Sequence, residues 1–153
     1  MNSKLILCLF AAVAAKTFAQ SGQFPQRHSP SSYVSKVWNP DLGNGMYKNP
    51  VINADYSDPD VVAVGDDYYM TASSFNCIPG LPILHSKDLV NWELIGHAVT
   101  KLQPESEFDK PSHGNGVWAP CISYHNGEFY IYWGDPDYGV FMVKTKNPSD
   151  KWE

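Results

Sequence analysis

The sequence predicts an all-β fold made of repeated, propeller-type sheets. The chain has 153 residues, of which 14% are aromatic and 18% charged, and this composition excludes most disordered, collagen-like and coiled-coil proteins. A strand–turn–strand pattern occurs twice, about sixty residues apart. Sustained helical periodicity of apolar residues is missing outside the N-terminal segment. Together these observations favour a β-rich globular protein.

The first element in chain order is an export signal rather than part of the fold. Residues 1–4 are positively charged, residues 5–15 form an apolar run of eleven, and residues 17–19 form a small-x-small cleavage site. Eleven apolar residues are too few to cross a bilayer, which needs about 20. The alternative is a short buried helix. We expect residues 1–19 to be a signal peptide cleaved after Ala19, and the protein to be secreted or periplasmic.

A leader or linker is expected at residues 20–48, because residues 21–36 are rich in Ser, Pro and Gln. The formal net charge is −5, and removal of Lys4 and Lys16 with the signal makes it more negative. Nucleic-acid binding depends on clustered Lys and Arg, and this chain has no basic run. The charge therefore argues against a nucleic-acid partner and is compatible with a neutral ligand.

Two cysteines, Cys77 and Cys121, remain after removal of the signal. They suffice for one disulfide in an oxidising compartment but not for a disulfide scaffold. No Cys or His pair has the close spacing of a structural zinc site, so we expect no metal site in this chain.

Two hairpins form the centre of the repeat. Each has β-branched and aromatic runs on both sides of a turn, at residues 65–67 and 126–128, which is the signature of strand, tight turn and strand. Pro59 and Pro120, which precede the hairpins, are 61 residues apart. The four expected strands are residues 61–64, 68–71, 122–125 and 129–132.

Each hairpin is followed by a third strand, a polar turn and a tryptophan, in residues 82–92 and 140–152. Trp92 and Trp152 are 60 residues apart, and we expect both to pack in the core. Such a unit fits a four-stranded propeller blade. The alternative is one β-sandwich with an accidental similarity. A propeller needs at least about four blades, so we expect the chain to be part of a longer parent.

Asp55, Asp58 and Asp60 crowd the segment before the first hairpin. On a strand period, Asp58 and Asp60 point to the same side, and Pro59 stiffens the segment between them. Two interpretations are open. Either one carboxylate faces a central cavity and deprotonates water, or the aspartates cap the start of the strand in Asx turns. The spacing does not match a calcium loop.

Phe75 follows the first hairpin, and Trp118 precedes the second. Aromatic faces stack on the C–H faces of sugars, so both residues are candidates for binding a neutral polar ligand. Core packing is the alternative for both.

Five motifs together resemble glycoside hydrolase family 43, in its β-xylosidase and α-L-arabinofuranosidase branch. They are Asn-Pro-Val-Ile at residues 49–52, Tyr-Ser-Asp-Pro-Asp-Val-Val at 56–62, Gly-Asp-Asp-Tyr-Tyr at 65–69, His-Ser-Lys-Asp-Leu-Val-Asn-Trp at 85–92 and Val-Trp-Ala-Pro at 117–120. The resemblance implies a five-bladed β-propeller with its active site in the central cavity. Residues 49–153 would be about its first two blades, which makes this chain an N-terminal fragment.

The resemblance also implies hydrolysis of terminal xylosides or arabinofuranosides of hemicellulose with inversion. Asp58 aligns with the general base, and Phe75 and Trp118 align with residues around the terminal sugar. The second Asp and the catalytic Glu of the family lie in later blades, so we expect this chain alone to be inactive. No cofactor is implied. Some relatives hold calcium in the central channel, but these residues provide no ligand set for it.

Several residues depart from the family pattern. Asp135 and Asp137 align with no catalytic position and are expected in a turn at the cavity rim. Many members have Asp where this chain has Cys121, and Cys77 lies in the loop after Phe75. We expect both cysteines at the rim, where a Cys77–Cys121 bridge across two blades would be within reach. Two other functions stay open, a non-catalytic carbohydrate-binding propeller module and an inert truncated product.

Overall fold

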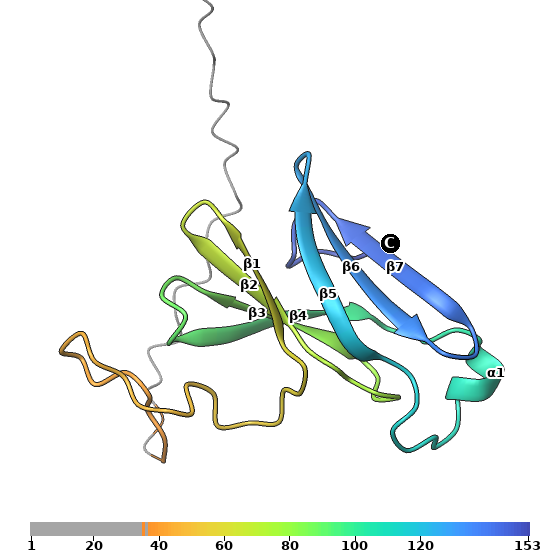
Figure 1. The fold of residues 1–153 in the computed structure, drawn as a ribbon, viewed down its shortest axis with the longest axis horizontal. Coiled ribbons are helices and arrows are strands. Elements are labelled where there is room, and N and C mark those ends of the chain that lie inside the picture. Colours follow the sequence, from red (N-terminus) through yellow and green to blue (C-terminus); the bar gives the residue numbers. More distant parts are fainter. Residues whose placement is uncertain (1–34, 36) are drawn as a thin grey trace, which may run out of the picture.

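The computed structural model describes residue 35 and residues 37–153, which contain seven strands and one short helix (Figure 1). A four-stranded sheet has the order β1-β2-β3-β4, and a three-stranded sheet has the order β5-β6-β7, with all neighbours antiparallel. The predicted all-β fold is confirmed. The elements are β1 (Asp60–Val64), β2 (Asp67–Thr71), β3 (Gly80–Ser86), β4 (Trp92–Val99), α1 (Glu105–Phe108), β5 (Trp118–His125), β6 (Glu128–Asp135) and β7 (Gly139–Thr145).

Both predicted hairpins are present, with two-residue turns. Val64 pairs with Asp67 in the first sheet, and His125 pairs with Glu128 in the second. The second turn is Asn-Gly with positive φ at Asn126 (50°) and Gly127 (84°), as tight hairpin turns require. Strand β5 begins four residues before its predicted start, because a register shift between Trp118 and Cys121 accommodates Pro120 within the strand.

The two sheets repeat one another beyond the hairpins. In the first sheet, β4 begins at Trp92, and Glu93 pairs with His85. In the second sheet, the backbone N–H of Glu153 donates to Lys144 O at 2.9 Å, and the N–H of Lys144 donates to Glu153 O at 2.7 Å. Glu153 therefore occupies the place of Glu93, which supports the predicted repeat.

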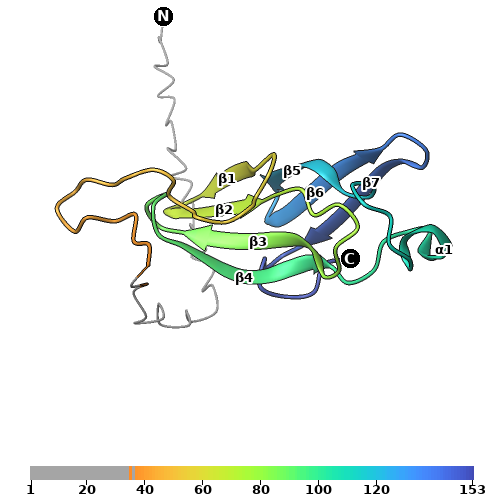
Figure 2. The same cartoon turned by 90° about the horizontal axis from the view of Figure 1, so that it is seen from below.

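The core lies between the two sheets, which meet where β1 and β5 run side by side (Figures 1 and 2). Tyr69 meets Phe129 edge to face, with ring centroids 4.9 Å apart. Burying side chains of this size contributes about 1.5–3 kcal/mol each. Trp152 is buried in this core as predicted, whereas Trp92 is only half-buried. Other buried members are Leu81, Ile83, Val117, Ile122, Ile131 and Trp133.

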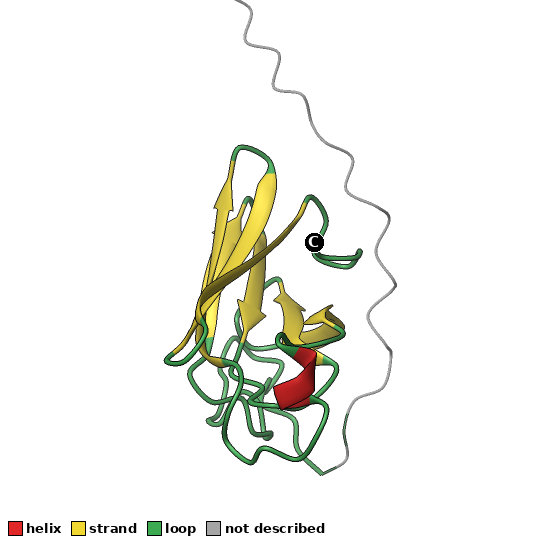
Figure 3. Cartoon of the chain, turned by 90° about the vertical axis from the view of Figure 1, so that its right-hand side faces the viewer, coloured by secondary structure: helices red, strands yellow, loops and turns green. Residues whose placement is uncertain are grey.

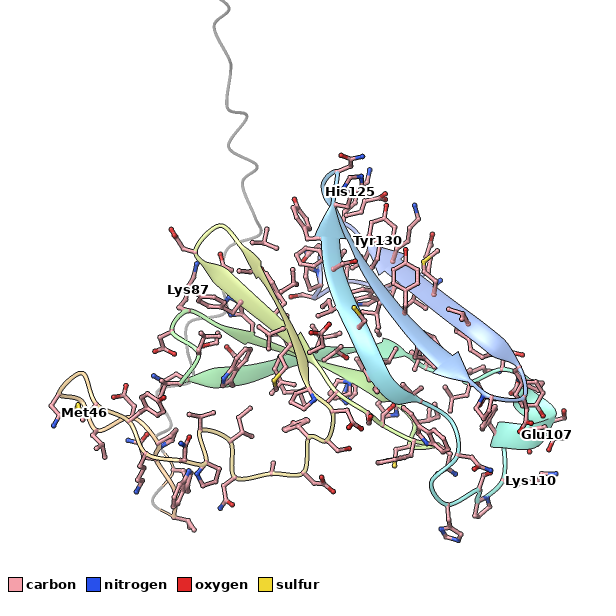
Figure 4. All side chains as sticks on the ribbon, viewed as in Figure 1. Met46, Lys87, Glu107, Lys110, His125 and Tyr130 are labelled. Atoms are coloured by element: carbon pink, nitrogen blue, oxygen red, sulfur yellow. The ribbon has the colours of Figure 1, made fainter. Side chains whose placement is uncertain are left out.

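The longer loops gather at one end of the sheets (Figure 3). The segment before β1, the segment after β2 and the start of β5 all belong to this end. Helix α1 has four residues, and no helix in the described part of the chain is long and apolar enough to cross a membrane. In Figure 4, Glu107 and Lys110 lie on the loop side, away from Lys87 and His125 at the hairpin tips.

The predicted signal peptide and most of the predicted leader lie outside the described residues. The described part of the leader contains a backbone bridge between Asp41 and Tyr47, and Asp41 Oδ2 accepts a hydrogen bond from Asn91 Nδ2 at 3.0 Å. Trp38 Nε1 also donates to Pro50 O at 2.9 Å. This part of the leader therefore contacts the first sheet, and the domain boundaries stay predictions.

Candidate active site

Asp58 lies two residues before β1, with an exposed side chain. Its φ of 49° is left-handed, so the two-residue period expected for a strand does not apply to it. Asp58 Oδ2 accepts a hydrogen bond from Ser73 Oγ at 2.8 Å. Within the described residues, Oδ1 of Asp58 makes no hydrogen bond. One oxygen is thus fixed and the other is open to a ligand or water.

Asp60 has a structural task instead. Its Oδ1 accepts a hydrogen bond from the N–H of Val61 at 3.0 Å, and its Oδ2 accepts one from the N–H of Ile122 at 2.8 Å. The carboxylate therefore ties the start of β1 to β5. Of the two roles considered for the aspartate cluster, capping of the strand fits Asp60. Asp58 remains the candidate for the catalytic role. Asp55 is exposed and makes no hydrogen bond within the described residues.

Ser73 connects Asp58 to the second sheet. It is 8% exposed, and its Oγ, which donates to Asp58, also accepts a hydrogen bond from the N–H of Ala119 at 2.8 Å. Ala119 has a φ of 38° and stands 61 residues after Asp58, so the two residues occupy equivalent places in the repeat. Sequence reasoning missed Ser73. Its one signal was a pair of serines that begins two residues after the end of a strand.

The two predicted sugar-binding aromatics lie beside this connection. Phe75 and Val117 form an isolated antiparallel bridge, with N–H to O distances of 3.0 Å in both directions. Phe75 is 36% exposed and Trp118 is 44% exposed, so neither fills the core. The indole N–H of Trp118 donates to Gly114 O, which fixes the ring. The bridge thus presents both aromatic side chains at the end of the sheets that carries Asp58.

A small groove of about 130 Å³ lies next to Trp118 and includes Asp135 in its wall. Asp135 Oδ1 accepts hydrogen bonds from the N–H groups of Asp137 at 2.9 Å and Tyr138 at 3.1 Å, which is the predicted turn. Loss of water contact, reinforced by Glu107, Asp137 and Asp135, raises the pKa of Tyr138. Phe108, Ser112, Asn115, Gly116 and Pro136 complete the wall. The rim role of Asp135 toward a substrate stays a prediction.

The Cys77–Cys121 bridge that the sequence allowed is not formed, because both residues are exposed free thiols. The neighbouring Asp60 side chain, together with partial burial, raises the pKa of the Cys121 thiol. The side chain of Cys121 therefore lies near the start of β1 and forms no bridge with Cys77.

A larger cavity of about 590 Å³ contains no carboxylate. It is lined by Asn49, Pro50, Val51, Ile52, Ala54, Tyr56, Pro59, Met70, Leu89 and Trp92. Met70 follows Tyr69 on β2 and so points to the face opposite the core, because neighbouring side chains on a strand alternate. Among residue 35 and residues 37–153, no group of three or more His, Cys, Asp and Glu is placed to hold a metal ion.

A family model described as glycosyl hydrolases family 43 matches residues 47–153. The chain belongs to this family. Among curated proteins, it is 41% identical over 118 residues to a non-reducing end alpha-L-arabinofuranosidase, BoGH43B, of Bacteroides ovatus. It is 40% identical over 131 residues to a beta-xylosidase of Formosa agariphila. These matches cover 74% and 81% of this chain but 22% of each relative.

Solved family 43 structures give the same result. The Bacteroides ovatus xyloglucan-locus GH43B matches with a TM-score of 0.56 at 42% identity, covering 69% of this chain and 22% of that chain. BlXynB of Bacillus licheniformis matches with a TM-score of 0.60 at 38% identity, covering 70% and 23%. The chain thus spans about a fifth of the length of the relatives that it matches.

Proposed function

We propose that this chain forms the first two blades of a longer, five-bladed family 43 glycosidase, in which Asp58 is the general base. The substrates are terminal xylosides or arabinofuranosides of hemicellulose. The observation that carries the proposal is the exposed Asp58 carboxylate, which is held through buried Ser73 to the backbone next to Trp118. Arabinofuranosidase and beta-xylosidase relatives support the pentoside class.

The reaction follows from one fixed and one open carboxylate oxygen. Asp58 Oδ1 accepts a proton from a water molecule while the water oxygen bonds to the anomeric carbon. The bond from that carbon to the leaving oxygen breaks, and a general acid outside this chain protonates the leaving oxygen. Inversion results because water and leaving group are on opposite faces of the sugar, with the two carboxyl groups roughly 6.5–9.5 Å apart.

Phe75 and Trp118 form walls for the sugar in this proposal. A pentose ring has apolar C–H faces, and aromatic rings supply a large apolar surface at little cost in conformational entropy. The exposure of both rings supports this role, because a core residue has no surface left for a ligand.

Export is the remaining part of the proposal. Residues 1–19 have the pattern of a signal peptide, so the mature protein begins at Gln20 and is secreted or periplasmic. N-terminal sequencing of the protein recovered from the medium or periplasm tests this. A start at Met1 in the recovered protein would contradict cleavage.

The catalytic role is tested in the longer protein with aryl β-xyloside and aryl α-L-arabinofuranoside. Asp58→Asn keeps the shape but removes the base, so kcat should fall about 10²–10⁴-fold. Asp55→Asn is the matched control, because Asp55 is an exposed aspartate three residues away. NMR of the first product anomer reports inversion. Normal turnover by Asp58→Asn refutes the role of Asp58, and sugar binding without turnover by the wild type favours a binding module.

A further inference from the structure

We infer that Ser73 is a positioning residue for the general base, an inference that rests on the function proposed above. Three hydrogen bonds converge on it. Its Oγ donates to Asp58 Oδ2, its Oγ accepts from Ala119 N–H, and its own N–H donates to Ser57 O at 3.0 Å. Ser73 therefore holds the side chain of Asp58 and the backbone directly before Asp58.

The direction of the hydroxyl proton of Ser73 is fixed by its partners. A serine hydroxyl has one proton and two acceptor lone pairs. The N–H of Ala119 can only donate, so it takes a lone pair. The single proton is then free for Asp58 Oδ2, which leaves Oδ1 as the oxygen that faces water.

Asp58 needs such support because its backbone is left-handed, with φ at 49°. A non-glycine residue keeps this conformation only when its surroundings hold it there. Ser73 is 8% exposed and supplies part of that support through its hydrogen bond to Asp58. Because it is buried, it acts through Asp58 and not on the sugar.

The inference predicts a selective loss in kcat. In the longer protein, Ser73→Ala frees Asp58, and a misplaced catalytic group costs up to about 10²-fold, so we expect kcat to fall roughly 10–100-fold. The KM should change less than about threefold, because Ser73 makes no sugar contact. Ser74→Ala is the matched control: Ser74 is 9% exposed, and its Oγ accepts from Leu81 N–H at 3.1 Å instead of contacting Asp58. Ser74→Ala should keep wild-type kcat.

A double variant of Ser73 and Asp58 distinguishes a positioning role of Ser73 from a general role in packing. If Ser73 acts through Asp58, adding Ser73→Ala to Asp58→Asn should lower the residual rate no further. Ser73→Cys replaces the hydroxyl with a slightly larger thiol that is a weak donor, so it should also lower kcat and is the second variant if Ser73→Ala does not fold. Aryl xyloside and arabinofuranoside are the probes in all variants.

Each contrary result overturns the inference. A wild-type kcat in Ser73→Ala or in Ser73→Cys does so, as does an equal loss in Ser74→Ala or a further loss in the double variant. If Asp58→Asn is inactive while Ser73→Ala has normal activity, only the role of Ser73 fails. If Asp58→Asn itself has normal activity, the proposed function fails and the role of Ser73 fails with it.

Discussion

Asp58 and Asp60 lie two residues apart but make different contacts. Asp60 accepts two backbone N–H groups and joins β1 to β5, whereas Asp58 is exposed and held by one hydroxyl. This difference follows from the left-handed backbone at Asp58, which breaks the strand period before β1 begins. Both carboxylate oxygens of Asp60 are thus engaged by backbone N–H groups, whereas Asp58 keeps one oxygen open.

Removing the Asp60 carboxylate should destabilise the protein. Asp60→Ala leaves the N–H of Ile122 without its acceptor in a partly buried place, which costs about 1–3 kcal/mol in the free energy of unfolding. Asp55→Ala, at an exposed site, should change it by no more than about 0.5 kcal/mol. Urea unfolding, monitored by tryptophan fluorescence, measures the free energy of unfolding of both variants. Equal stability of both variants would refute the structural role of Asp60.

The sequence predicted Asp58, Phe75 and Trp118 because each belongs to a short local motif. It did not predict Ser73, because that residue acts through partners 15 and 46 positions away in the chain. It also could not decide whether Cys77 and Cys121 form a bridge, since the sequence does not reveal which way a side chain in a loop and one on a strand point. The missed contacts are all long-range.

At the scale of elements, the repeat conserves a cross-strand charge pair. Asp67 on β2 accepts a hydrogen bond from His85 on β3 at 2.6 Å, and Lys87 lies within ion-pair distance. Glu128 on β6 pairs with Lys144 on β7 at 3.3 Å, at the equivalent positions. Partial burial raises the pKa of Asp67, but the hydrogen bonds from Lys87 and His85 outweigh it and lower the pKa below its ordinary value.

Acid should therefore weaken the first sheet through Asp67. A lowered folded-state pKa adds stability above the unfolded value of 3.8, and this stability is lost as the pH falls through the folded value, below 3.8. We expect Asp67→Asn to be less stable at neutral pH and to lose less stability on acidification. Asp66→Asn, in the adjacent turn, is the control and should follow the wild type. Unfolding midpoints across acidic pH check this, and parallel curves for Asp67→Asn and wild type would contradict it.

Gly116 lies directly before the Phe75–Val117 bridge and leaves no room for a side chain. A Cβ there would lie 2.3 Å from Phe75 O, and φ is 101°. Gly116→Ala should push the bridge apart, lower the thermal midpoint and raise KM. Gly139→Ala is the matched control. The φ of Gly139 is also positive, at 95°, but no atom lies within 4 Å of the added Cβ, so this variant introduces backbone strain without a close contact. If both variants lose the same stability, the close contact is not the cause.

The hairpins were predictable because Gly, Asp and Asn mark tight turns between β-branched and aromatic runs. The early start of β5 was not, because Pro120 usually ends a strand and only the register shift in the pair admits it. Helix α1 has four residues, too few for an apolar period to show.

At the scale of the molecule, the 153-residue chain has exposed apolar side chains on both sheets. Val61 and Leu94 are 40% and 48% exposed on the first sheet, and Val140 and Met142 are 78% and 46% exposed on the second. Such surface favours association with further protein. We therefore expect the chain alone to bind a hydrophobic dye and to self-associate in ultracentrifugation, and a longer protein to do neither. A monomer without dye binding would refute this.

The chain alone should also fail to hydrolyse aryl pentosides. In the proposed mechanism the general acid lies outside these residues, and acid catalysis contributes about 10²–10⁴-fold. Assay of the 153-residue chain beside the longer protein tests this. Turnover by the short chain that disappears in Asp58→Asn would show that no further residues are needed.

The connection from Asp58 through Ser73 to Ala119 has a consequence for protein engineering. A chimera with its crossover between β4 and β5 would take Asp58 and Ser73 from one parent and the backbone amide of residue 119 from the other, so their alignment would depend on how sheets from two parents pack. Residues 58–119 therefore form one exchangeable unit, and crossover points for recombining relatives belong outside it.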